Sequence, residues 1–179
     1  SVFGDHSNRE FTSDEILKLW GEPMFLALFI PLTVIFAVCS LLAFVEYFRS
    51  RIPKSVFFAC IVYLPSYFGG VQTIAFKSVS EMTANAVVSE DGIGEFNTWK
   101  PWLFVCTVIP LAIGQLKVIN VGAEYFQATK FFPAYSAGLM MMVVIYGAGF
   151  FQEYDKLHPV AFPFGLFVLT VGIFLLAGK

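Results

Sequence analysis

Continuous apolar runs dominate the chain, and they are long enough to cross a lipid bilayer as helices. A bilayer core of roughly 30 Å needs about 20 apolar residues at a rise of 1.5 Å per residue. Strands of a membrane barrel would instead alternate apolar and polar residues in segments of about ten. The pattern therefore predicts an all-α membrane protein whose residues 23–178 form five transmembrane helices, over residues 24–46, 55–76, 101–119, 130–152 and 159–178.

The third of these runs is the weakest. It extends only from Pro101 to Leu116 before Lys117 interrupts it. A lysine near a helix end can direct its amine toward the headgroups while its methylenes stay in apolar surroundings. With Lys117 extended in this way, the run continues to Ile119 and spans the bilayer.

Residues 1–22 precede the first run and are polar and acidic. Thr12 and Glu15 have the spacing of a helix capping box, and Ile16 and Trp20 would share an apolar face of the helix that follows. We predict an extracytoplasmic, interfacial helix with Trp20 at the headgroup level; the alternative is an acidic loop. The segment lacks the basic start and apolar run of a signal peptide, so we expect a further segment upstream.

The composition also points to lipid as the solvent. Hydrophobic residues make up 58% of the chain and charged residues 13%, whereas an ordinary soluble domain has about 45–50% and about 25%. The predicted partner is therefore the lipid bilayer, and a net charge of -2 predicts no nucleic-acid partner. Cys39, Cys60 and Cys106 lie in three different runs and read as small buried hydrophobes, with neither a disulfide framework nor a metal-ligand spacing.

Loop charges predict the orientation in the membrane. Basic residues of short cytoplasmic loops set the topology of helical membrane proteins. The short loop after the first run contains Arg49, Arg51 and Lys54, whereas the longest connection, Lys77 to Lys100, is rich in acids. We therefore place the first loop in the cytoplasm, the N-terminus outside and the C-terminus in the cytoplasm.

Polar side chains within or beside the spans are the candidates for function, because lipid makes buried polar groups costly. No hydrolase or nucleotide-binding motif is present, so we predict no enzyme activity, no catalytic residue and no cofactor. The alternatives for these polar residues are interhelical hydrogen bonds for the glutamines, a helix cap for the asparagine and an interface anchor for the tyrosine. The predicted substrate or ion path consists of Gln72, Gln115, Asn120, Glu124 and Tyr135.

Small residues mark where helices approach each other closely. Gly69 and Gly70 lie in the middle of the second run, and Ala134 and Gly138 are four residues apart in the fourth. Pro65 precedes the glycine pair, so the stretch from Pro65 to Gly70 is predicted either to pack against other helices or to be a hinge, a break in the helix that lines a cavity.

Several of these residues belong to a pattern that resembles a known family. Ser66-Tyr67-Phe68-Gly69-Gly70 is followed by Lys77, and Gln115-Leu116-Lys117-Val118-Ile119-Asn120-Val121-Gly122 is followed by Phe126, Ala128, Pro133, Tyr135 and Gln152-Glu153. In this spacing the chain resembles the C-terminal half of NIPA-like magnesium transporters of the drug/metabolite transporter superfamily.

The resemblance implies a ten-helix fold of two five-helix repeats with inverted topology, of which this chain supplies one repeat. The implied partner is the missing N-terminal repeat or a second copy of the chain, and one repeat alone is expected to be inactive. The implied substrate is Mg²⁺, as a transported ion and not at a stable protein metal site. Oxygens of Gln115, Asn120, Glu124 and Tyr135 suit this ion.

Two other functions stay open. The many aromatic residues and the few acids within the spans favour transport of a small organic solute, as elsewhere in the superfamily. A non-transporting membrane scaffold is the third possibility, against which the intramembrane glutamines and the predicted break in the second span argue.

Overall fold

The computed structural model describes residues 13–88 and 98–151, together with residues 164, 165, 168 and 171. The described part is helical and contains no strand. Its elements are α1 (Ser13–Trp20), α2 (Pro23–Phe44), α3 (Glu46–Arg49), α4 (Lys54–Val88), α5 (Trp99–Tyr125) and α6 (Ala128–Phe151). Of these, α2, α4, α5 and α6 are long and apolar enough to cross a membrane. Most of the predicted fifth span, residues 159–178, lies outside the described residues.

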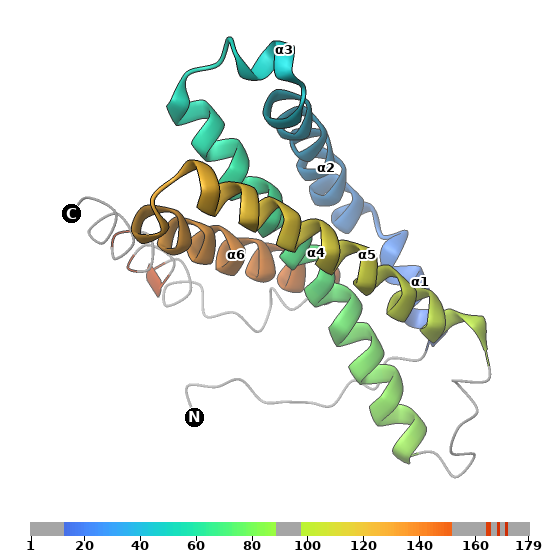
Figure 1. Cartoon of the computed structure of the whole chain (residues 1–179). Helices are drawn as coiled ribbons and strands as arrows, with labels where there is room; N and C mark the ends of the chain where they lie inside the picture. The colour runs from blue at the N-terminus through green and yellow to red at the C-terminus, as the bar shows by residue number, and fades with distance from the viewer. Residues whose placement is uncertain (1–12, 89–97, 152–163, 166–167, 169–170, 172–179) are drawn as a thin grey trace.

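The central helix of the bundle is α4. It packs most extensively against α5 and α6 and next against α2 (Figure 1). Two buried clusters surround it. One contains Ile16, Phe25, Ile74 and Phe150, and the other contains Ala43, Ile61, Leu64, Val118 and Phe131. In contrast, α2 and α5 bury little of their surface inside the described chain.

The helix that contains the predicted span 55–76 is longer than that span, because α4 continues to Val88. Lys77 and Glu81 interrupt the apolar run, which limits the part of the helix that can lie in lipid. Neither residue breaks a helix, since lysine and glutamate have high helix propensity. The first half of the predicted loop from Lys77 to Lys100 is therefore helix.

Residues 13–20 form the short helix that was predicted before the first span, and not an acidic loop. Its C-terminal residue Trp20 was expected at the headgroup level. Its ring packs against the rings of Phe25, Phe29, Phe104 and Phe150, with centroid distances of 5.3–6.4 Å. Trp20 thus joins α1 to α2, α5 and α6.

The three cysteines are free thiols, as their separation in the sequence predicts. Cys60 is buried and Cys39 is partly buried, but Cys106 is exposed. The expectation of burial is wrong for Cys106, because its face of α5 has no neighbour among the described helices.

Candidate functional site

Three residues singled out from the sequence meet where α4 crosses α5 and α6. The Gln115 side-chain nitrogen donates a hydrogen bond of 2.7 Å to the Tyr135 hydroxyl. A Cβ atom added at Gly69 would lie 2.9 Å from that nitrogen and 2.2 Å from Cδ1 of Leu139. Gly69 therefore leaves the space through which a side chain of α5 reaches α6 across α4.

Ser66 extends this contact by one helical turn. Its hydroxyl donates to the Val62 carbonyl at 2.8 Å and lies 3.4 Å from the Tyr135 carbonyl oxygen. A Cβ atom at Gly138 would lie only 2.6 Å from the Ser66 oxygen. Small residues on both helices thus let the α4 and α6 backbones approach closely, as in other membrane helix pairs.

Gly70 has the same role toward the C-terminal part of α6. A Cβ atom there would lie 2.5 Å from the Tyr146 ring and 2.9 Å from Cβ of Met142. The packing prediction for Gly69, Gly70 and Gly138 agrees with these contacts. Ala134 is a partly buried residue of α6, immediately before Tyr135.

The proposed break between Pro65 and Gly70 is not present. Residues 54–88 form one continuous helix with Pro65 buried inside it. Proline removes the amide donor that would bind the Ile61 carbonyl, but α4 is packed against α2, α5 and α6, which hold this buried segment in place. The small residues of this stretch therefore serve packing, and the alternative of a helix break lining a cavity is wrong.

Gln72 lies one turn beyond Gly69 on α4. Its side-chain nitrogen is buried and has no hydrogen-bond partner among the described residues. An unpaired buried donor costs about 1–3 kcal/mol. Gln72 is thus the predicted path residue with hydrogen-bonding capacity left over inside the bundle.

Asn120 and Glu124 are not brought to this cluster. Both are exposed on α5, whereas Val118 and Gly122 of the same helix are buried. Two residues correspond to about 200° around a helix, so each polar residue points away from the buried residue that precedes it by two. Together with exposed Lys117, they form a polar stripe on the outer face of α5.

A second polar group joins α2 to α4, and the sequence analysis missed it. Thr33 and Tyr67 share a hydrogen bond of 2.8 Å between their hydroxyls, and the Tyr63 hydroxyl donates to the Leu32 carbonyl at 2.8 Å. The Tyr67 ring also stacks on Phe36, with centroids 4.5 Å apart. The available signal was the spacing of four between two tyrosines inside an apolar run, which places both on one helix face.

No group of three or more His, Cys, Asp or Glu side chains able to hold a metal ion lies within the described residues. The polar groups of the bundle are instead amides and hydroxyls at helix crossings, together with the exposed stripe on α5.

Long apolar helices that pack through small residues and bury a few hydrogen-bonded polar side chains define an integral, multi-pass membrane protein. The family model for magnesium transporter NIPA matches residues 2–179, so the chain belongs to this family. Membership implies a non-enzymatic protein for membrane transport of Mg²⁺ or a related cation. Searches of curated proteins and of solved structures return no significant match.

Proposed function

We propose that the chain transports Mg²⁺ as the C-terminal half of a NIPA-like transporter. The observation that carries the proposal is the exposed stripe of Lys117, Asn120 and Glu124 on α5, a helix long and apolar enough to span a membrane. Polar and charged groups within membrane helices face protein or water-filled cavities and mark substrate paths. The ion path then runs along this face of α5.

The chemistry of the stripe suits Mg²⁺. The ion prefers oxygen ligands, keeps several of its waters and is held by one or two carboxylates. Glu124 supplies a carboxylate and Asn120 supplies an amide oxygen one turn earlier on the same face. Lys117 repels a cation unless its amine is directed away from the path, which its long side chain permits.

A second helical unit is needed to cover the stripe. Inverted-repeat transporters hold their substrate between two units, so the stripe needs a second unit opposite it to form a path. The N-terminal repeat of a ten-helix fold is the partner that we propose. A second copy would have to insert in the opposite orientation, which the basic cluster Arg49, Arg51 and Lys54 opposes.

The buried cluster has a supporting role in this proposal. The bond between Gln115 and Tyr135 joins α5 to α6 five residues before Asn120. It therefore fixes the rotation of α5 about its axis, and with it the direction in which Asn120 and Glu124 point. Gln72, whose amide nitrogen is buried and unpaired, lies inside the bundle and not on the exposed stripe, so it is not part of the path that we propose along α5.

Reconstitution tests the substrate and the need for a second unit separately. Liposomes holding an Mg²⁺-sensitive dye receive the chain alone or the chain together with an N-terminal five-helix repeat. We expect saturable Mg²⁺ entry only with both units. Saturable entry with the chain alone would contradict the requirement for a second unit, and uptake of an organic solute without Mg²⁺ entry would contradict the substrate.

A further inference from the structure

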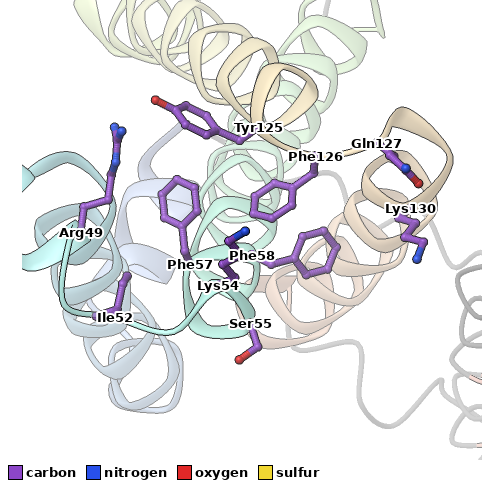
Figure 2. Close-up of a pocket in the computed structure, with 10 residues that line it drawn as sticks. All are labelled: Arg49, Ile52, Lys54, Ser55, Phe57, Phe58, Tyr125, Phe126, Gln127 and Lys130. Atoms are coloured by element: carbon purple, nitrogen blue, oxygen red, sulfur yellow. The ribbon is translucent and has the colours of Figure 1, made fainter.

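A pocket of about 900 Å³ lies at the end of the bundle where α2 and α5 end and α4 and α6 begin. Its walls come from three separate parts of the chain: the end of α3 with the turn that follows it, the first turns of α4, and the junction of α5 with α6 (Figure 2). This volume is typical of sites for small molecules. No residue of the proposed ion path lines the pocket, so it needs an explanation of its own.

The charge of the pocket is strongly positive. Arg49, Lys54 and Lys130 line it, and no carboxylate is among the described lining residues. Figure 2 shows Arg49 and Lys130 on opposite sides of the pocket. Three cations around one pocket favour an anion and disfavour Mg²⁺.

Aromatic contacts hold the arginine in position. The Arg49 guanidinium carbon lies 4.9 Å from the ring centroid of Tyr125 and 5.9 Å from that of Phe57. Stacking on rings leaves the edge donors of a guanidinium available, and these match two phosphate oxygens at once. The ring contacts therefore hold the Arg49 guanidinium in a position where it can bind a phosphate group.

The helix starts add to this positive field. The amides of Val56 and Phe57 both donate to the Pro53 carbonyl, and those of Lys130 and Phe131 both donate to the Gln127 carbonyl. At the N-termini of α4 and α6, the backbone amides that lie between the cap residue and the first hydrogen-bonded amide have no acceptor in their own helix. Both termini have a partial positive charge, which favours anions.

The remaining lining is apolar and points to a lipid as the ligand. The rings of Phe57, Phe58 and Phe126 pack together with centroid distances of 4.9–5.6 Å and lie between the two outer cations (Figure 2). A free phosphate has no apolar part that could pack against these rings, whereas the glycerol and first methylenes of a lipid can pack against them. The pocket is also at the right depth for a lipid headgroup, because the ends of membrane helices lie at headgroup depth.

We propose that this pocket binds an anionic phospholipid whose headgroup includes a phosphate monoester. The charges agree: the phosphodiester contributes one negative charge and the monoester about -1.5 to -2, against the three cations. The orientation predicted from the basic loop places the site in the cytoplasmic leaflet, where anionic lipids are concentrated. The site is independent of the proposed ion path.

The full chain in phosphatidylcholine nanodiscs provides the test. Phosphatidylinositol 4-phosphate is titrated as the probe, with phosphatidylinositol as the control that lacks only the monoester, and binding is measured by native mass spectrometry. We expect the probe to bind about tenfold more tightly than the control. Equal affinity for the two lipids would overturn the proposal.

Matched variants locate the site. Lys54→Gln with Lys130→Gln should remove the preference for the monoester, and Arg49→Lys should reduce it because a lysine cannot bind two oxygens in a plane. Arg51→Gln is the control: Arg51 lies in the same turn but stacks on Tyr47 outside the pocket. An equal loss with Arg51→Gln, or an unchanged preference in both pocket variants, would overturn the assignment.

A soluble arm distinguishes lipid from free phosphate. Inositol 1,4-bisphosphate has phosphates at the same two ring positions, both as monoesters, without the glycerol and acyl chains. We expect it to displace the lipid poorly at equal concentration, because it has no apolar part to pack against the rings of Phe57, Phe58 and Phe126. Displacement as efficient as that by the lipid itself would contradict a lipid ligand.

Discussion

The amide nitrogen of Gln115 lies 2.7 Å from the hydroxyl oxygen of Tyr135, and this bond passes directly over Gly69. Three helices thus meet at one polar contact inside an apolar bundle. A side chain on α4 at this position would separate α5 from α6. The contact therefore depends on the absence of a side chain as much as on the two polar groups.

Removing this bond should measurably loosen the bundle. Tyr135→Phe removes the acceptor and leaves the Gln115 amide without its partner, and Gln115→Met removes the donor. Hydrogen bonds between membrane helices are worth about 0.6 kcal/mol on average. A double-mutant cycle on thermal unfolding in detergent should give a coupling energy of about that size. Strict additivity would show that the bond contributes nothing.

Gly69→Ala should destabilise the chain strongly. The added methyl would lie 2.2 Å from Leu139, and overpacking of this kind costs about 1–3 kcal/mol. Gly147→Ala on α6 is the matched control, because nothing lies within 4 Å of a Cβ atom there. The unfolding temperature should fall for Gly69→Ala and should stay the same or rise for Gly147→Ala. Leu139→Ala should partly rescue Gly69→Ala.

Glu124→Gln should weaken Mg²⁺ uptake by the two-unit transporter. The substitution removes the negative charge from the exposed stripe of α5 and keeps a side chain of nearly the same size and shape. Glu46→Gln is the control, since Glu46 is also exposed at this end of the bundle but lies at the start of α3. We expect an increased KM for Mg²⁺ only in the first variant. Unchanged uptake at equal surface expression would exclude Glu124 from the path.

The orientation is testable with single cysteines in a chain whose three native cysteines are replaced. Ser50 and Thr98 are exposed and lie on the two connections that we predict on opposite sides. An impermeant thiol reagent added to intact cells should label a cysteine at Thr98 and not one at Ser50. The reverse labelling would invert the topology.

The docking of α1 should depend on pH only in strong acid. The Lys100 ammonium donates a hydrogen bond to the Asp14 carboxylate and lowers the pKa of that group below its ordinary value of 3.8. The pair therefore stabilises docked α1 above pH 3.8, and this contribution is lost as the pH falls through the lowered pKa. The effect is small because Asp14 is exposed.

In a chain whose Trp99 and Trp102 are replaced by Phe, Trp20 fluorescence between pH 7 and pH 2 reports this docking, because its ring packs against Phe25 and Phe104. The native chain should change signal below pH 3.8, and Asp14→Asn should show no such step. An identical step in Asp14→Asn would assign the change to another group.

Four of the predicted spans correspond to the apolar helices α2, α4, α5 and α6, because long apolar runs are a direct consequence of lipid as the solvent. The sequence did not indicate how far α4 continues beyond the apolar run, because hydropathy measures residence in lipid and not helix formation. Helix ends are set by chain breakers, and none occurs between Lys77 and Val88.

The candidate site was predicted in part. Gln115, Tyr135 and Gly69 were singled out individually because buried polar and small residues are unusual in lipid. Their meeting was not predictable, since it depends on how three helices cross. The same applies to the basic pocket, whose residues come from separate turns and become one surface only after packing.

The length of α4 has a mechanical consequence. Its 35 residues extend about 52 Å at 1.5 Å per residue, well beyond a hydrocarbon core of roughly 30 Å. Its C-terminal end projects past the neighbouring helices (Figure 1). A tilt of about 10° around the middle of such a rod moves its tip by about 4–5 Å. Because α4 contacts α2, α5 and α6, a spectroscopic probe near Thr83 would report small rearrangements of the whole bundle in amplified form.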